Sequence, residues 1–590
     1  MDPIDYAQLE DGSHCNYWAL DPTLRRAAER AYPDDEFDWA ESRLSAFGSV
    51  VGHTVADNAD AVDERGIDLH TYDRNGDLAN DVRYPRELLE SERLAYEHGT
   101  VADAFRAPAD REEPVGLVHT LTMQALLSHA DAGLTCPVSM TAGAALVLGN
   151  HDDGHLDGYL DGLTAREGDE RIEGAMFLTE KQGGSDVGAA ETVAERVEGR
   201  EYELTGEKWF CSNVDAQGTL VLARRPDAPE GTAGLSLFLV PHELPDGRLN
   251  DQTYRRLKDK LGTISVPTGE VELQGATGYL VGEPEEGFRY MTTMLNWERV
   301  TNATGAVGII GRGLLEAKVH AANREAFGKR LDELPLMRRD LAALSVEYEA
   351  VVAVTMEAAR WLDRYERDRG DEEAFKLMRV LAPLSKHHTA RAAVDCSSDA
   401  MEILGGDGYV REFVTHRLLR DAQVLPIWEG TSNVLSLDLL RAFDRADAAP
   451  TFLTFCRERL DEATHPALAA AVEEAETRHE ALQSALFSLA DADEADAQHG
   501  AKELSRLCYD VLAASLLLAG AQAEIDERGD ARLAAVARWF VRDRFESPAD
   551  RGVSDSEAVS REAFDAIVRH AGLDPESLTD GGEDGDGGDD

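Results

Sequence analysis

The sequence has few cysteines and no pattern that would pair them. Six occur among 590 residues, and none lies in a Cys-x-x-Cys pair. We therefore expect neither a disulfide framework nor a metal site. The cysteines, which lie far apart in the chain, are Cys15, Cys136, Cys211, Cys396, Cys456 and Cys508.

Signals for export or for a membrane are also lacking. The chain begins Met-Asp-Pro-Ile-Asp, without the basic and apolar regions of a signal peptide. The longest apolar run, residues 511–523, is too short to span a bilayer and predicts a buried helix. We expect a cytoplasmic protein without membrane insertion.

Lysine is scarce, because only nine of the 59 basic residues are lysines. Aspartate and glutamate together number 113, which gives a formal net charge of −54 spread over the whole length. This composition resembles that of salt-in halophile proteins, in which high salt screens the self-repulsion. The charge therefore indicates the solvent before it indicates a partner.

Length and periodicity predict several domains with sizeable cores, since 43% of the residues are hydrophobic. Helical spacing dominates residues 1–170, and short alternating runs follow in residues 171–286. Long helical segments return in residues 287–447 and 448–578, while residues 579–590 contain only Gly, Asp, Glu and Thr and are expected to be disordered. The expected fold is α+β and multidomain: an N-terminal helical domain, a small central β-barrel, an antiparallel four-helix bundle and an appended helical domain.

The individual elements follow from the same patterns. Residues 154–168, rich in Gly and Asp, are expected to form a hinge. The expected strands are 172–179, 202–205, 208–212, 218–225 and 235–241. The expected helices are 86–105, 119–148, 290–327, 335–368, 372–404, 432–443, 467–490, 501–525 and 531–545.

The segment IWEGTSN, residues 427–433, places Glu429 between an aromatic residue and a glycine. A base on a tight loop that faces a flat apolar cofactor would need such a placement, with Gly430 free to turn. Taken alone, Glu-Gly-Thr-Ser could equally be a surface turn.

Four further segments give this glutamate its context. Glycines in the first of them would let backbone N–H groups approach a phosphate. Each segment alone has an ordinary alternative, such as a glycine turn, a core tryptophan or a helix end. They are MFLTEKQGGSD (176–186), TGEKWFCSN (205–213), REAFGKRL (324–331) and EILGGDGY (402–409).

In this order, over about 260 residues, the segments resemble the motifs of the acyl-CoA dehydrogenase family. The resemblance implies FAD as cofactor, with Arg324, Gly405 and Gly406 contacting the pyrophosphate in a neighbouring subunit of a homotetramer, a dimer of dimers. Cys211 stands where the family has a hydroxyl near flavin N5, and Ser212 follows it, so either could face the flavin. Glu402 replaces a family glutamine. The residues implied to bind FAD are Leu178, Thr179, Gly184, Ser185, Trp209, Cys211, Ser212, Arg324, Phe327, Gly405, Gly406, Thr431 and Asn433.

The resemblance also implies the reaction, which is α,β-dehydrogenation of an acyl-CoA. Glu429 would remove the α-proton, a hydride would pass to the flavin, and electron-transfer flavoprotein would accept the electrons. Glu298, directly before Arg299, is the alternative base, because branched-chain and long-chain members carry their glutamate on this helix. We expect Glu429 to be the base and Glu298 to be a structural partner of Arg299.

Residues 81–85, 127–141 and 335–338 resemble the branch of the family that contains the alkylation-response flavoprotein AidB. A C-terminal domain associated with double-stranded DNA belongs to that branch, but beyond Pro450 this chain has 13 basic and 32 acidic residues, which disfavours phosphate binding. A nucleic-acid-binding flavoprotein with little catalysis and a non-catalytic acyl-CoA-binding regulator are the alternatives to the enzyme. The arginines that could form a basic stripe, unless they pair with carboxylates, are Arg528, Arg532, Arg538, Arg542 and Arg544.

Overall fold

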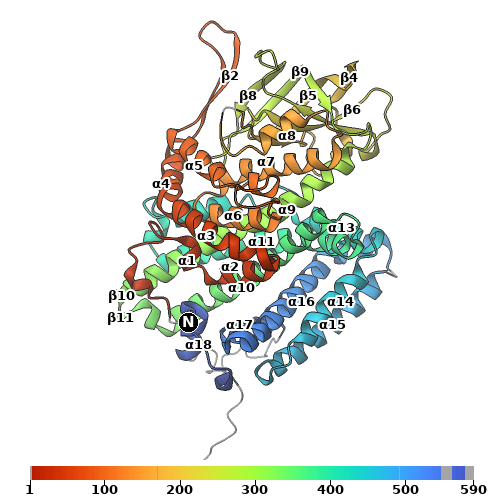
Figure 1. The fold of residues 1–590 in the computed structure, drawn as a ribbon. Coiled ribbons are helices and arrows are strands. Elements are labelled where there is room, and N and C mark those ends of the chain that lie inside the picture. The colour runs from red at the N-terminus through yellow and green to blue at the C-terminus, as the bar shows by residue number, and fades with distance from the viewer. Residues whose placement is uncertain (1–2, 169, 491, 546–560, 579–590) are drawn as a thin grey trace, which may run out of the picture.

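The computed structural model describes residues 3–168, 170–490, 492–545 and 561–578. The β-domain lies at one end of the molecule, the long helices of the bundle lie in the middle, and the appended helices lie at the other end (Figure 1). The expected α+β multidomain architecture is thus confirmed. The predicted acidic tail, residues 579–590, lies outside the described residues.

The N-terminal region is mainly helical, as predicted, but several of its elements differ from the expected ranges. The expected helix 86–105 ends at Glu97. The expected helix 119–148 is broken at Asp131, whose carboxylate accepts a 2.9 Å hydrogen bond from Leu134 N and so begins a new helix. The expected hinge 154–168 contains a short helix. The helices are α1 (Tyr17–Leu20), α2 (Pro22–Ala31), α3 (Asp34–Val50), α4 (Ala56–Arg65), α5 (Arg86–Glu97), α6 (Leu117–Ala130), α7 (Ala132–His151) and α8 (Asp157–Leu163).

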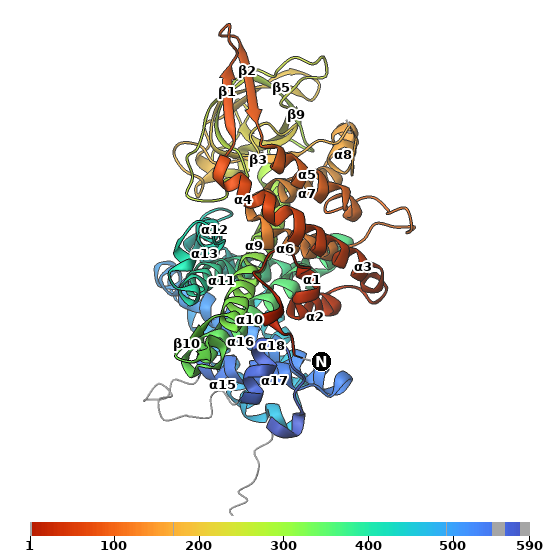
Figure 2. The same cartoon turned by 90° about the vertical axis from the view of Figure 1, so that its left-hand side faces the viewer.

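A β-hairpin interrupts these helices, and the sequence analysis missed it. Its strands β1 (Asp68–Tyr72) and β2 (Leu78–Arg83) are antiparallel, with Asp68 opposite Arg83. Gly76 in the connecting turn has φ +87°, a conformation that favours glycine. The hairpin projects at the β-domain end of the molecule (Figure 2).

The β-domain is a small barrel, as expected. Strand β6 pairs with both β4 and β7, so that β6, β4, β5, β9 and β7 form a closed ring, which β3 and β8 extend. The two predicted runs 202–205 and 208–212 are one strand, and β4, β8 and β9 were not predicted. The strands are β3 (Gly174–Phe177), β4 (Val193–Glu198), β5 (Glu201–Ser212), β6 (Gly218–Arg224), β7 (Leu235–Val240), β8 (Gln252–Leu257) and β9 (Thr268–Leu280).

Four long helices form the predicted bundle. The third of them coincides with the prediction, because Asp371 caps its first turn through a 3.0 Å bond from Ala374 N and Gly405, at φ +64°, ends it. The bundle helices are α9 (Gly287–Asn323), α10 (Pro335–Arg367), α11 (Glu372–Leu404) and α13 (Ser432–Arg445). Between them lie a short helix, α12 (Thr415–Ala422), and a tight hairpin of β10 (Glu325–Ala326) and β11 (Lys329–Arg330).

The appended helices pack on the bundle and on the N-terminal region through buried ion pairs. Arg532 lies 2.6 Å from Glu349 of α10, and Arg26 of α2 lies 2.9 Å from Glu524. The appended helices are α14 (Ala449–Glu462), α15 (Ala469–Ala490), α16 (Glu494–Arg528), α17 (Arg532–Phe545) and α18 (Arg561–Arg569). Two helices, α7 and α16, are long and apolar enough to cross a membrane, but they are mostly buried, as core helices are.

Two hydrophobic cores organise the molecule. One fills the helical regions, and the other fills the β-barrel. Helix α7 contributes Leu134 and Val138 to the helical core and Ala144 and Leu148 to the barrel core. Helix α7 therefore joins the β-domain to the helices through both cores.

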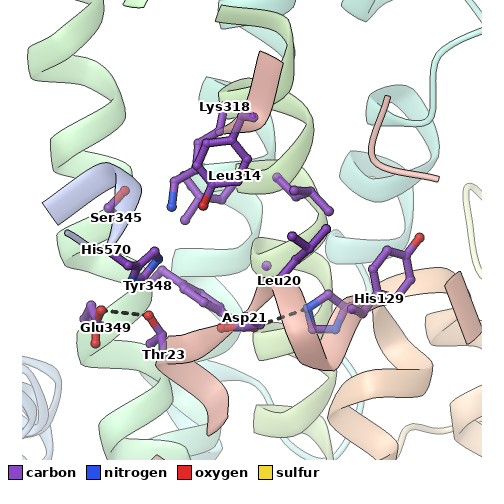
Figure 3. A pocket seen from close by; sticks show the side chains of 14 residues that line it. Leu20, Asp21, Thr23, His129, Leu314, Lys318, Ser345, Tyr348, Glu349 and His570 are labelled. Atoms are coloured by element: carbon purple, nitrogen blue, oxygen red, sulfur yellow. Dashed lines mark hydrogen bonds and ion pairs between the residues drawn. The ribbon is translucent and has the colours of Figure 1, made fainter. Parts of the chain in front are cut away.

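A small polar cavity lies where the N-terminal segment, α9, α10 and α18 meet (Figure 3). Its volume of about 30 Å³ suits about two water molecules. Thr23 donates to Glu349 at 2.7 Å beside it, and burial lowers the pKa of Lys318, on its wall, to about 8. None of the motif residues lines this cavity, so the site is elsewhere.

Candidate active site

Glu429 lies on a turn between α12 and α13 and has a left-handed backbone with φ +56°. Such a conformation costs an L-residue about 1–3 kcal/mol and needs support from its surroundings. The next residue, Gly430, has φ +103°, which explains why glycine follows the glutamate. Thr431 and Asn433 lie exposed at the start of α13.

The environment of Glu429 suits a base. Burial raises the pKa of its carboxyl to about 7, against the opposing effect of two cations, Lys386 and Arg299. A carboxylate in this range is a far stronger base than a solvated one and is still ionised in much of the population near neutral pH.

Glu298 is buried in α9 on the α7 side of the site. Its carboxylate accepts a 2.9 Å hydrogen bond from the Ser139 hydroxyl, and Ser139 O accepts from the Trp297 indole at 2.9 Å. Burial, and then the charge of Glu429, raise the pKa of Glu298 well above its usual value. The two carboxyls therefore influence each other, and one of them is expected to be protonated.

The expected pairing of Glu298 with Arg299 is wrong. Arg299 lies 2.6 Å from Asp438 of α13, and Arg379 lies 3.2 Å from the same carboxylate. Successive residues of a helix point in different directions, which is why the neighbours in sequence are not partners.

The first two motifs meet at the mouth of the barrel. Trp209 N donates a 2.9 Å hydrogen bond to Thr179 O. A Cβ on Gly184 would lie 2.5 Å from Thr179 Oγ1, so only glycine allows this close approach. Ser185 is exposed beside it, and Leu178 is half-buried against the barrel core.

A buried ion pair joins these two motifs, and the sequence analysis missed it. Lys208 Nζ lies 2.8 Å from Glu180, and both side chains are buried. Glu180 also accepts from Glu191 N at 2.6 Å and from the Thr192 hydroxyl at 2.5 Å. The ion pair thus fixes the loop after Thr179. The one sequence signal for a buried Lys208 is the alternation along β5, in which Lys208 falls on an inward-facing position.

Cys211 and Ser212, neighbours at the end of β5, differ in how far each is exposed to solvent. Cys211 is fully buried in the barrel core, whereas Ser212 is half-buried and lies 3.1 Å from the Thr268 hydroxyl. Trp209 is half-buried, with the Lys258 ammonium 3.5 Å from its ring centroid. Ser212 is therefore the better placed of the two for contact with a cofactor.

Arg324, Phe327 and the glycine pair are not brought to Glu429 within one chain. Arg324 follows Glu298 by 26 residues, about 40 Å of helix axis. Phe327 is 95% exposed, and Gly405 and Gly406 are exposed with open space around them. Surfaces of this kind suit completion of a site in a second copy of the chain.

Glu402, which replaces the family glutamine, is exposed and lies near Asp340 and Asp399. No ion pair joins it to Arg411 in the part of the chain that the structure describes.

The C-terminal arginines are engaged within the fold instead of forming a basic stripe. Arg532 is buried against Glu349, and Arg528 lies 2.8 Å from Glu29. The remaining contacts are Arg544 with Glu347, Arg538 with the Leu578 carbonyl and Arg542 with the Trp539 ring.

Three family models match the chain in the order of its domains. The N-terminal domain of the adaptive response protein AidB matches residues 7–170. The acyl-CoA dehydrogenase middle domain matches residues 175–276, and the acyl-CoA dehydrogenase C-terminal domain matches residues 285–443.

Several known proteins resemble the chain over most of their length. Acyl-CoA dehydrogenase family member 11 of Caenorhabditis elegans is 33% identical over 440 residues, 72% of this chain and 70% of the relative. AidB of Escherichia coli strain K12 is 35% identical over 396 residues, 64% and 69% of the two chains. The 3-methylmercaptopropionyl-CoA dehydrogenase of Ruegeria pomeroyi is 31% identical over 446 residues, 70% and 72%.

Solved structures give the same result. The fold is similar to Caenorhabditis elegans ACDH-11 in complex with C11-CoA, with a TM-score of 0.85 and 27% identity over 93% of this chain and 97% of that one. It is also similar to Bd2924 in its apo form, with a TM-score of 0.79 and 31% identity over 87% and 99%. With its three matching domains in order, the chain belongs to the acyl-CoA dehydrogenase family.

Proposed function

We propose that the protein dehydrogenates an acyl-CoA thioester between Cα and Cβ, with Glu429 as the base. The single observation that carries this proposal is the half-buried carboxylate of Glu429 on a strained turn, with a pKa raised to about 7, in a chain of this family.

The residues present fit FAD, the cofactor of this flavin-dependent family. Thr179 and Gly184 form a close contact at the barrel mouth that a Cβ would fill, and Ser185 is exposed beside them. Arg324, Gly405 and Gly406 would hold the pyrophosphate of FAD in a second copy, which favours a dimer of dimers. Bound FAD would supply the acceptor for the two electrons removed from the substrate.

The proton step falls to this chain's own residues. The α-proton of a thioester is too weakly acidic for a solvated carboxylate, so water must be excluded and the base strengthened. Partial burial of Glu429 strengthens the base, and a bound acyl-CoA would exclude the remaining water. Burial and the charge of Glu429 raise the pKa of Glu298, which favours its neutral form, and its carboxyl accepts a hydrogen bond from the Ser139 hydroxyl.

We place the reaction in the cytoplasm, with electron-transfer flavoprotein as the acceptor. Nucleic-acid binding with little catalysis is the competing function. It is disfavoured because Arg528, Arg532 and Arg544 are already paired with carboxylates.

Anaerobic titration of the purified protein with acyl-CoAs of increasing chain length tests the proposal. Protein prepared in high salt is expected to be yellow, to release FAD on denaturation and to bleach with at least one chain length. A colourless protein that cannot be reconstituted, or a flavin spectrum indifferent to every thioester, would contradict it.

A further inference from the structure

Lys386 is a buried cation that the motifs do not include. It lies in the middle of α11 and has no solvent exposure. Its ammonium donates a 2.6 Å hydrogen bond to the carbonyl of Gly430, the residue directly after the base. This bond connects the bundle to the turn that carries Glu429.

The turn needs such a contact. Glu429 has φ +56°, and a left-handed backbone is unfavourable for an L-residue unless its neighbours fix it. Thr431 is the N-cap of α13 but makes no side-chain capping bond. The bond from Lys386 therefore supports the turn from the bundle, in addition to the hydrogen bond between the Glu429 carboxylate and its own backbone N–H.

The charge of Lys386 acts on the same carboxylate. Burial lowers the pKa of Lys386 to about 7, and the charge of Glu429 opposes this. Burial raises the pKa of Glu429, and the charge of Lys386 is the largest of the effects that lower it. An ammonium with only a carbonyl for a partner is costly to bury unless a carboxylate lies near.

Other charged or titratable groups surround Lys386 and Glu429. Arg299, the second cation near Glu429, is bonded to Asp438 at 2.6 Å, whereas the hydrogen bond that Lys386 makes within the described residues goes to the turn itself. The groups that interact electrostatically with the pair are Cys136 of α7, Glu298 and Arg299 of α9, and His387 of α11. Lys260, Arg379 and Asp438 lie one step further away, Lys260 beside Cys136 and the other two beside Arg299.

Building on the proposed function, we propose that Lys386 is a positioning residue for the base. Its hydrogen bond fixes the turn of Glu429 and Gly430, and its positive charge keeps the Glu429 carboxylate ionised before the acyl-CoA arrives.

Three substitutions in the FAD-loaded full chain separate the two roles. Lys386→Met removes the charge and the donor, Lys386→Gln keeps a donor without the charge, and Lys386→Arg keeps the charge. Lys376→Met is the matched control, because Lys376 lies on the same helix, 3.6 Å from Asp447 at the surface. The rate of anaerobic flavin reduction by an accepted acyl-CoA is measured against pH, together with KM.

Loss of the charge is expected to move the midpoint of the pH–rate profile upward from about 7 by about one unit, which lowers the rate at neutral pH about fivefold. Lys386→Met and Lys386→Gln both show this shift, but only Lys386→Gln recovers the full rate at high pH, because it can still donate to Gly430. Lys386→Arg and Lys376→Met keep the midpoint, and KM stays within about twofold throughout. A crystal structure of Lys386→Met, which needs no turnover, should show the Gly430 carbonyl turned from its place.

An unchanged midpoint in Lys386→Gln overturns the proposal, even if the melting temperature falls, because a merely structural lysine would alter stability and not the profile. If Lys386→Met does not fold, Lys386→Gln and Lys386→Arg decide the question. Glu429→Gln in the same assay separates a failure of the proposed function from a failure of the role of Lys386. If Glu429→Gln reduces its flavin normally, the proposed function fails. If it does not, and the Lys386 variants keep the midpoint, only the role of Lys386 fails.

Discussion

Replacing Lys208 by methionine should destabilise the β-domain strongly. Lys208 Nζ gives one hydrogen bond to Glu180 at 2.8 Å and one to the Leu222 carbonyl at 2.9 Å, inside the barrel. Without it, Glu180 remains as a buried carboxylate without a cation. Breaking a buried pair by removing one partner costs about 3–5 kcal/mol. Because Glu180 keeps its bonds from Glu191 and Thr192, we expect about 3 kcal/mol.

Urea unfolding at high salt, followed by tryptophan fluorescence, measures this loss. Lys181→Met is the control, because Lys181 is exposed and its ion pair with Glu207 is long, at 4.0 Å. This substitution should change stability by less than about 1 kcal/mol. Adding Glu180→Gln to Lys208→Met should restore part of the loss, because the unpaired charge is removed.

The pH dependence of the same experiment follows from Glu180. Burial alone would raise the pKa of Glu180, but Lys208 and the hydrogen bonds bring it below its usual value. A carboxyl with a lowered folded-state pKa contributes stability above its unfolded pKa, about 4.3, and loses it as the pH falls. The difference between wild type and Lys208→Met should therefore be full at neutral pH and shrink in acid. A loss below about 1 kcal/mol, or one independent of pH, would refute the reasoning.

Three further predictions concern the site. Arg324→Gln should weaken FAD binding at least about tenfold, because a hydrogen bond to a charged group is lost, whereas substitution of the exposed Lys329 by Gln should not weaken it. Light scattering should show a dimer or a tetramer, and a monomer with full FAD content would contradict the shared site. Turnover should require electron-transfer flavoprotein or a dye, and rapid turnover with oxygen alone would indicate an oxidase instead. The rate of flavin reduction should rise with pH through about 7, because the raised pKa of Glu429 means that the base forms only as that carboxyl ionises; a rate that is flat from pH 5 to 9 would exclude this assignment.

Helices were predictable where apolar spacing and end signals agree. For α11, Asp371 and Gly405 mark both ends in the sequence, and the observed helix has the expected bounds. The break at Asp131 escaped detection because apolar residues continue on both sides, and only the capping bond to Leu134 reveals it. The domain boundaries at which we divided the chain stay predictions.

Strands were harder to predict because their partners are distant. Five of the six residues of strand β4 are exposed and three are charged, so the strand has no hydrophobic alternation, and it exists because β5 pairs with it. The strands β1 and β2 were missed for the same reason, because most of their residues are exposed or half-buried.

The candidate site was predictable as motifs but not as contacts. The sequence indicated Thr179, Gly184 and Glu429, whose residue types carry a recognisable spacing. It could not indicate that Lys208 reaches Glu180 or that Arg299 reaches Asp438 across 139 positions, because such pairs depend on the packing of the whole chain. The role of each motif residue in binding FAD stays a prediction.

The choice between Glu429 and Glu298 is the most direct test of the account. The measurement is the anaerobic rate of flavin reduction by an accepted acyl-CoA in Glu429→Gln and in Glu298→Gln, with FAD content and acyl-CoA affinity as controls. Glu429→Gln keeps the size of the side chain and should retain both ligands, yet lose flavin reduction by a factor of about 10³ or more, as expected for an essential base. Glu298→Gln should keep the rate within about tenfold, because its amide can still bond to Ser139. The opposite pattern would move the base to Glu298, and two variants that both reduce flavin at the wild-type rate would contradict proton abstraction by this protein.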